Sequence, residues 1–352
     1  MRKIRGVLRN VSLFGLALSA VLPFVLNSLA VQAAVDPPLY TLHAVVPIPH
    51  YDAQACFDIA SVANGKLYLA DSTNRAVAII SGTRLRQIGA GLFQGIAGCH
   101  QFDFSRQGPN GVLIEHGKIW VGDGDSTVKV FKLSNKQLLA TIATGPSTNN
   151  RADEMNYIPI TNQVVVANPD APAHPYLTYI DASTFNIVAK QSFKEATAGL
   201  EQPRFAHGLL YQAVPATTMN PGGEIDAINP VTRAIIIRYA TGNCGPSGLV
   251  ITGPLAAIGC ANGADEMLNL LSGKTIVITD SGAADMVAAD PARRHFFFAS
   301  YAAARVYVTD ADGHLLQQIQ TDSRAHSVAV DSRNGELYIP EGSLGGVAEY
   351  SL

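Results

Sequence analysis

The stretch RADEMNYIPITNQVVVANPDAPAHPYLTYID, residues 151–181, is the clearest copy of a unit that recurs along most of the chain. After an acidic pair and a short apolar segment, residues 159–162 form a turn and residues 163–167 form a β-branched run. A polar loop and a second apolar run at residues 177–180 follow. This order of runs and turns predicts consecutive antiparallel strands.

Seven copies of this unit can be counted, each of roughly 40 to 50 residues and about four strands, which is the repeat length of a β-propeller blade. The seventh copy stops about one strand short, and a lone alternating segment at residues 40–48 supplies the missing strand. Pairing the two would leave no open sheet edge. The sequence therefore predicts an all-β, seven-bladed β-propeller closed by the N-terminal strand, with a two-domain β-sandwich as the alternative.

The first 33 residues have the composition of a secretory signal peptide. Basic residues precede an apolar run at residues 11–26, and a small-residue cleavage site follows at residues 31–33. We expect cleavage there, which leaves residues 34–352 as the propeller domain, periplasmic or secreted, with no membrane span after cleavage. An uncleaved anchor helix is the alternative.

Net charge and cysteine content narrow the function classes. A formal net charge of -3 argues against a surface that binds nucleic acid. Four cysteines in an exported chain predict two disulfides. Cys244 and Cys260 flank an expected strand pair, which favours that pairing and leaves Cys56 with Cys99. Metal ligation by cysteines is the alternative, but the chain has no C-x-x-C pair.

Three of the repeats share a strand-turn-strand sequence pattern: KLYLADSTNRAVAII from Lys66, NQVVVANPD from Asn162 and HSVAVDSRNGELYIP from His326. In this sequence pattern the chain resembles the YVTN or YncE-like family of exported bacterial seven-bladed propellers. The resemblance covers nearly all of the chain after residue 33 and implies a propeller fold and export. It implies no particular activity, because this fold carries many unrelated functions.

The first strand of each blade lines the central channel of a propeller, so residues at those strand starts converge from distant positions. One such residue can be named for each blade: Asp58, Asn110, Glu154, Arg204, Ser247, Asp285 and His326. Oxygen ligands suit Ca²⁺ or Mg²⁺, and the predicted metal ligands are Glu154, Asn110, Asp285 and Asp58. The alternative is that these residues only cap turns.

Two of the strand-start residues are candidates for catalysis. His326 is the best candidate for a general base, because its ordinary pKa lies near neutrality. Arg204 would hold a substrate carboxylate or neutralise neighbouring acidic groups. His100 and His207 are weaker candidates, and His174 is expected in a surface loop. No nucleophile elbow, zinc-binding H-E-x-x-H pair or phosphate-binding loop is present in the sequence.

The leading interpretation is a monomeric exported propeller that binds a small molecule, glycan or envelope protein through its central funnel. The alternative is a metal-dependent hydrolase or lyase, since an oxygen-rich funnel is similar to that of lactonase-type propellers. A scaffold for envelope proteins is a third interpretation. The sequence does not identify the ligand.

Overall fold

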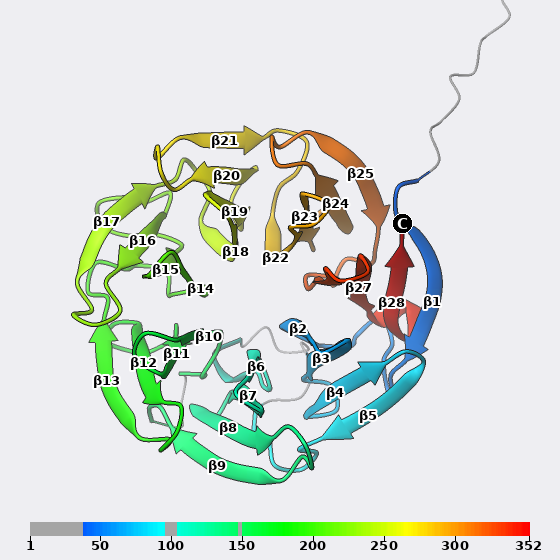
Figure 1. The fold of residues 1–352 in the computed structure, drawn as a ribbon, viewed down its shortest axis with the longest axis horizontal. Coiled ribbons are helices and arrows are strands. Elements are labelled where there is room, and N and C mark those ends of the chain that lie inside the picture. The colour runs from blue at the N-terminus through cyan, green and yellow to red at the C-terminus, as the bar shows by residue number, and fades with distance from the viewer. Residues whose placement is uncertain (1–37, 96–103, 147–149) are drawn as a thin grey trace, which may run out of the picture. The chain divides into compact units, whose positions relative to one another are not determined.

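Seven four-stranded antiparallel sheets surround a central axis in the unit Pro38–Leu352 (Figure 1). The structure is a computed structural model, and it describes residues 38–95, 104–146 and 150–352. The predicted signal peptide lies outside these ranges. The arrangement is that of a seven-bladed β-propeller, which confirms the predicted fold class.

The strands follow the chain blade by blade, from the innermost strand to the outermost. Blade one contains β2 (Ala60–Ala63), β3 (Lys66–Asp71), β4 (Ala76–Ser81) and β5 (Arg84–Ile88). Blade two contains β6 (Val112–Glu115), β7 (Lys118–Asp123), β8 (Thr127–Lys132) and β9 (Leu138–Ala143). Blade three contains β10 (Met155–Ile158), β11 (Gln163–Asn168), β12 (Tyr176–Asp181) and β13 (Ile187–Ser192). Blade four contains β14 (Pro203–Ala206), β15 (Leu209–Val214), β16 (Glu224–Ile228) and β17 (Ile235–Ala240).

The remaining blades follow the same plan until the last. Blade five contains β18 (Pro246–Thr252), β19 (Leu255–Cys260), β20 (Asp265–Asn269) and β21 (Thr275–Ile278). Blade six contains β22 (Ala284–Asp290), β23 (His295–Ser300), β24 (Arg305–Thr309) and β25 (Leu315–Gln320). Blade seven contains β26 (Ala329–Asp331), β27 (Glu336–Glu341), β28 (Gly346–Ser351) and β1 (Thr41–Pro47).

The N-terminal strand closes the ring, as the short seventh repeat predicts. Strand β1 pairs antiparallel with β28, from Thr41 opposite Ser351 to Pro47 opposite Gly346 (Figure 1). The last blade therefore joins the two ends of the propeller, and β28 has a partner on both sides. This pairing satisfies backbone groups that an edge strand would otherwise expose.

The hydrophobic core lies between neighbouring blades. One cluster joins Tyr68 and Val77 of blade one to Val121 and Phe131 of blade two. Since each blade packs against a neighbour on both faces, the second and third strands are near-continuous apolar runs. In β3, every residue after the first is buried, whereas most side chains of the outermost strands are exposed. This difference explains why the second and third strands are the parts of each repeat that are easiest to recognise in the sequence.

Two-residue hairpin loops join the first two strands in blades one, two, four and five. The turn Asn64-Gly65 has φ values of 52° and 70°, and His207-Gly208 has φ values of 51° and 80°. Two successive positive φ values are the signature of a type I′ turn, which favours Asn and Gly. His207, a weaker candidate for the funnel, lies in such a turn, and its Nε2 is 2.6 Å from the Gly253 carbonyl oxygen.

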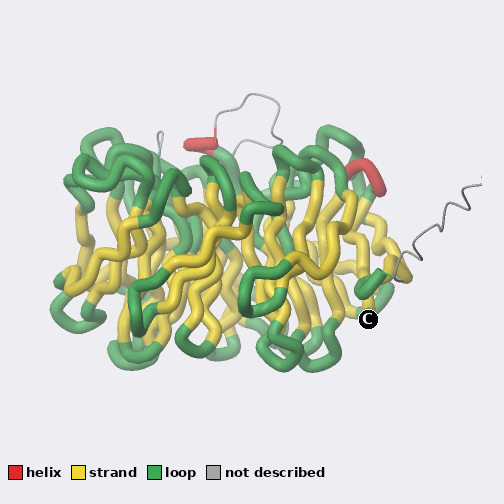
Figure 2. The backbone as a smooth tube through the Cα atoms, turned by 90° about the horizontal axis from the view of Figure 1, so that it is seen from above, coloured by secondary structure: helices red, strands yellow, loops and turns green. Residues whose placement is uncertain are grey.

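Two 3-10 helices, η1 (Phe104–Arg106) and η2 (Gly342–Leu344), lie in loops on the same side of the propeller (Figure 2). The described part of the chain contains no helix that is long and apolar enough to cross a membrane.

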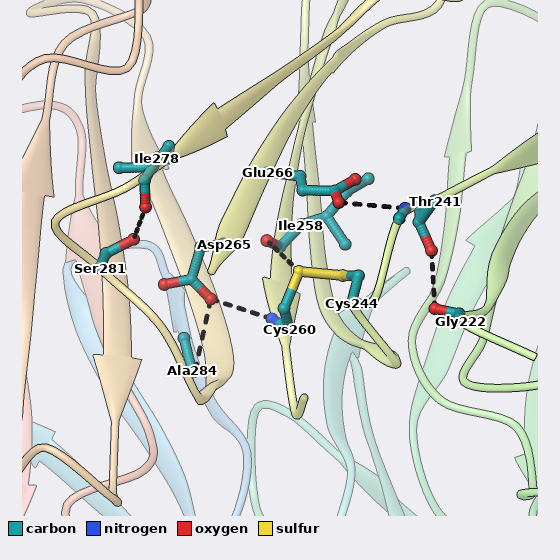
Figure 3. Close-up of a disulfide and its surroundings, with 11 residues drawn as sticks. Gly222, Thr241, Cys244, Ile258, Cys260, Asp265, Glu266, Ile278, Ser281 and Ala284 are labelled. Atoms are coloured by element: carbon teal, nitrogen blue, oxygen red, sulfur yellow. Dashed lines mark hydrogen bonds between the residues drawn. A yellow bond between two sulfur atoms is a disulfide. The ribbon is translucent and has the colours of Figure 1, made fainter. Parts of the chain in front are cut away.

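The predicted disulfide between Cys244 and Cys260 is present, with the two Cα atoms 4.5 Å apart (Figure 3). It forms at the start of blade five, where Pro246 of β18 pairs with Cys260 at the end of β19. The Asp265 carboxylate accepts a hydrogen bond from the Cys260 backbone N–H at 3.0 Å (Figure 3). The second predicted disulfide, Cys56 with Cys99, includes a residue outside the described ranges.

Candidate functional site

Backbone pairing identifies the residue at which each innermost strand reaches the channel. In blade one the fourth residue of β3 pairs with Ala60, in blade three the fourth residue of β11 pairs with Met155, and in blade four that of β15 pairs with Pro203. Ala60, Met155 and Pro203 are therefore equivalent positions on the innermost strands. The residue two positions before each of them is the one equivalent to Asp58. We call this set the funnel ring: Asp58, Asn110, Asp153, Glu201, Ser247, Asp285 and His326.

Five of the seven ring positions are those chosen from the sequence, and two differ. In blade three the ring residue is Asp153 rather than Glu154, and in blade four it is Glu201 rather than Arg204. The backbone N–H groups of both ring residues donate to β11 and β15, at Ala167 and at Ala213. The ring therefore contains four carboxyl groups, one more than the sequence-based set. Glu201 and Asp153 are the residues that sequence reasoning missed.

Six of the seven ring residues line a cavity of about 570 Å³ at the entrance of the channel, and Asn110 is the exception. The other lining residues are Ala55, Gln107, Arg151, Glu154, Ala261, Tyr301, Ser323 and Arg324. The cavity lies on the side where the loops lead from one blade to the next, because the ring residues precede or begin the innermost strands. We call it the funnel cavity.

His326, Asp285 and Ser247 form a hydrogen-bonded group in the wall of the funnel cavity. Nδ1 of His326 is 2.7 Å from Asp285 Oδ2, and the Ser247 hydroxyl donates to Asp285 Oδ1 at 2.6 Å. Nε2 of His326 is 2.9 Å from the Phe57 carbonyl oxygen, and the Phe57 ring stacks on the imidazole. Since a carbonyl oxygen only accepts, Nε2 carries a proton.

Burial opposes the charge of His326, but the hydrogen bond and the negative charge of Asp285 outweigh it and raise the pKa to about 9. Burial raises the pKa of Asp285, and the bonds from His326 and Ser247 outweigh it and lower that pKa below its ordinary value. At neutral pH the pair is an imidazolium and a carboxylate. An imidazolium has no lone pair to accept a proton, so this arrangement disfavours the predicted role of His326 as a general base.

Arg151 is a second cation that sequence reasoning did not select. Its Nε donates to Asp153 Oδ2 at 2.7 Å, and its Nη1 is 3.3 Å from Asp170 Oδ2. Arg151 precedes the ring position of blade three by two residues, and its side chain lines the funnel cavity. The Arg151 guanidinium thus fixes Asp153 in place and neutralises one ring carboxylate.

Three other carboxyl groups of the funnel cavity form no ion pair among the described residues. Burial, followed by the charge of Asp153, raises the pKa of Asp58 to about 7. The same two causes raise the pKa of Glu201 well above its ordinary value. Burial also raises the pKa of Glu154, although Arg204 opposes it. No hydrogen bond stabilises any of these three carboxylates among the described residues, and Glu154 Oε2 is fully buried without a partner.

Arg204 and Asn110 do not line the funnel cavity. Arg204 donates to Gln202 Oε1 at 2.6 Å and lines a smaller cavity of about 230 Å³ together with Glu154. Nδ2 of Asn110 donates to the Gln107 carbonyl at 2.6 Å, and the side chain is fully buried. Arg204 therefore lies below the ring rather than at the funnel mouth, where a substrate carboxylate would need it.

Three of the residues predicted to bind Ca²⁺ or Mg²⁺, Asp58, Glu154 and Asp285, do not form a cluster with one another. Both ions need several oxygen ligands within about 2.6 Å of one point. In the part of the chain that the structure describes, three clusters of His, Cys, Asp and Glu place their ligand atoms within 4.8 Å of one another. None of the three includes Asp58, Glu154 or Asp285. The metal-dependent hydrolase or lyase mechanism in the funnel stays a prediction.

The weaker histidine candidates lie elsewhere. His174 is exposed in the loop between β11 and β12, as the sequence predicts. His100 lies outside the described residues. His207 lies in a hairpin turn at the far end of β14 from the ring. Among the described histidines, only His326 therefore reaches the funnel cavity.

Comparisons with known proteins show the fold alone. No family model matches the chain, and no curated protein matches its sequence. A chain of hydrazine synthase from Kuenenia stuttgartiensis superposes with a TM-score of 0.70 at 11% identity, covering 89% of this chain and 99% of that one. A chain of the mitotic checkpoint complex gives 0.67 at 11%, covering 95% and 99%. The computationally designed Ika8 protein gives 0.61 at 12%, covering 88% and 100%. These similarities place the chain among β-propeller structures.

Proposed function

We propose that this protein is a binding propeller whose funnel cavity takes a small, hydroxylated molecule that carries a positive charge. The observation that carries the proposal is the group of three carboxyls at the channel entrance, Asp58, Glu154 and Glu201, whose pKa values are raised by burial and which form no ion pair among the described residues. Burying a carboxylate without a partner costs free energy, and a bound ammonium group or hydroxyl donors would remove that cost.

The charge balance of the cavity supports a cationic ligand. Its lining contains five carboxyl groups and three cationic side chains, Arg151, Arg324 and His326. Two of the cations are engaged with Asp153 and Asp285. Arg324 is at the rim, where its Nη2 donates to Gln54 Oε1 at 3.1 Å. Asp58, Glu154 and Glu201 therefore remain at the centre without an ion pair, and a bound cation would favour their ionised form.

The wall of the cavity supports a ligand with an apolar face. Tyr301 is 43% exposed, and Ala55 and Ala261 also contribute to the lining. An exposed aromatic ring stacks on the C–H face of a sugar or on an organic cation. Since the cavity volume of about 570 Å³ is in the range of small-molecule sites, a monosaccharide-sized ligand suits it.

Three sugars of the same size test the charge preference. We expect glucosamine to bind more tightly than glucose, and glucose more tightly than glucuronate, in calorimetric titrations at pH 7. Substituting Glu201→Gln or Asp58→Asn should weaken glucosamine binding about tenfold while keeping side-chain shape. Asp312→Asn changes an exposed carboxylate outside the funnel and serves as the control. Tighter binding of glucuronate, or equal effects of the three substitutions, would refute the proposal.

We also propose that the protein is exported, belongs to the YVTN or YncE-like propellers and acts as a monomer. The composition of residues 1–33 supports export, and the strand-turn-strand sequence pattern of the repeats supports the family. A disulfide suits an oxidising compartment. Amino-terminal sequencing of protein from a periplasmic extract should begin near Ala34, and light scattering should give the mass of one chain. Full-length protein retained in the cytoplasm would contradict export.

A further inference from the structure

Three metal-ligating side chains meet on neighbouring strands of the blade that closes the ring. His43 comes from β1, Glu336 from β27 and Glu349 from β28, and their ligand atoms all lie within 4.8 Å of one another. Nε2 of His43 is 2.5 Å from Glu336 Oε1. The cluster lies outside the funnel, and none of its members lines the funnel cavity.

A β-bulge brings His43 to this cluster. Leu42 pairs with Tyr350 and Ala44 pairs with Glu349, so His43 is the extra residue between two paired positions. A bulge re-aims a side chain that regular alternation would point to the other face. On the partner strands, Glu349 of β28 is opposite Tyr338 of β27. Tyr338 is two residues after Glu336, and residues two apart in a strand point to the same face, so the carboxylates of Glu336 and Glu349 are on one face.

Glu349 is the second, independent sign of a ligand. The residue is only 5% exposed, and among the described residues its carboxylate has no hydrogen bond. It shares its surroundings with a second carboxylate, Glu336, whose side chain is 18% exposed. Two carboxylates at one half-buried place repel each other unless a cation lies between them. His43, 41% exposed at its side chain, leaves this place accessible from solvent.

We propose that His43, Glu336 and Glu349 bind a divalent transition-metal ion of the Zn²⁺ class. One imidazole and two carboxylates are a ligand set that Zn²⁺ accepts, with water in the fourth position. At metal–ligand distances of about 2.1 Å, tetrahedral ligand atoms are about 3.4 Å apart. The His43 and Glu336 atoms would therefore separate by about 1 Å, which the exposed His43 side chain permits.

The other two clusters differ from this one. One contains Glu266 and the two cysteines of the disulfide, whose sulfur atoms are bonded to each other and are not thiolates. Asp310, Asp312 and His314 lie in one exposed turn, and Asp310 already accepts bonds from the backbone N–H groups of the other two. Those backbone hydrogen bonds explain why the three side chains lie together in a turn, without a metal ion. The cluster on the closing blade spans three strands that are distant in sequence, so an ion there would link the N-terminal strand to β27 and β28.

The test uses full-length protein purified without a polyhistidine tag and treated with a chelator. Calorimetric titration with Zn²⁺ should show one site, and His43→Ala and Glu349→Gln should each lower its affinity at least tenfold. His174→Ala and His314→Ala remove exposed histidines and should leave the affinity unchanged. At a Zn²⁺ concentration a hundredfold above Kd, the melting temperature should rise by about 4 °C in the wild type and not in His43→Ala.

Circular dichroism in the chelator confirms that each variant is folded, and Glu336→Gln replaces any that is not. Equal Zn²⁺ affinity in wild type and His43→Ala would overturn the proposal. So would loss of binding in His314→Ala, which would assign the site to the exposed turn. The funnel variant Asp58→Asn should bind Zn²⁺ as the wild type does, so this result is independent of the proposed funnel ligand.

Discussion

Substituting Asp58→Asn should make the protein more stable at alkaline pH and leave it almost unchanged at acidic pH. The pKa of Asp58 is raised to about 7, chiefly by burial, from an ordinary value of 3.8. The folded protein thus holds a proton on Asp58 that the unfolded chain releases between these two values. Stability therefore falls as the pH rises from about 4 to about 7. Asparagine has the same shape and does not ionise, so the variant escapes this loss.

The magnitude follows from the two pKa values. Each tenfold change in proton affinity corresponds to about 1.4 kcal/mol, so the difference between 3.8 and about 7 amounts to about 4 kcal/mol above pH 7. Two effects reduce it. Water in the open funnel screens the charge, and the ionised Asp58 also stabilises the nearby His326 imidazolium. We expect the variant to gain about 2 kcal/mol at pH 8 and much less at pH 4.5.

Urea unfolding of wild type and Asp58→Asn at pH 4.5 and pH 8 measures this difference. Asp312→Asn, an exposed carboxylate, is the control and should show the same small effect at both pH values. A variant that is no more stable than wild type at pH 8 would refute the raised pKa. A residue that destabilises the free protein is typical of a ligand site, since the ligand offsets the cost.

Three further predictions concern the scaffold and the ring. Replacing Cys244 and Cys260 by Ser should lower the free energy of unfolding by about 3 kcal/mol, because a loop with a sequence separation of 16 is no longer closed in the unfolded chain; urea titrations measure this. Deleting residues 34–48 leaves the edge of β28 unpaired, and light scattering should show aggregation, whereas a monodisperse variant would contradict the role of closure. His326→Gln should be most destabilising below pH 6.5, with the difference shrinking as pH rises through about 9, where His326 loses its proton despite Asp285; unfolding at pH 6 and pH 9.5 tests this.

The sequence predicts the architecture because each blade repeats one pattern. The second and third strands are covered on both faces, so their apolar runs, such as residues 163–167, stand out from polar turns. Closure by β1 follows from the missing strand of the seventh repeat. The disulfide follows because Cys244 and Cys260 flank one hairpin. These features depend on local pattern and on counting.

The exact ring residues could not be predicted in two blades because several polar residues precede the strand. In blade three, Asp153 and Glu154 are adjacent, and only the pairing with β11 decides which belongs to the ring. In blade four, Glu201 is three residues before the chosen Arg204. The cluster around His43 was not visible either, because it depends on a bulge and on strands about 300 residues apart.

The closing pair of strands also sets an order of events during synthesis. Thr41 and Ser351 are paired although 310 residues separate them along the chain. Strand β1 is therefore made among the first segments of the propeller, and its partner is made last. Six blades can form in turn while β1 waits without hydrogen bonds, and the ring is completed only when β28 arrives. A chain that stops early keeps an open edge, so a completed ring distinguishes a finished chain from a truncated one.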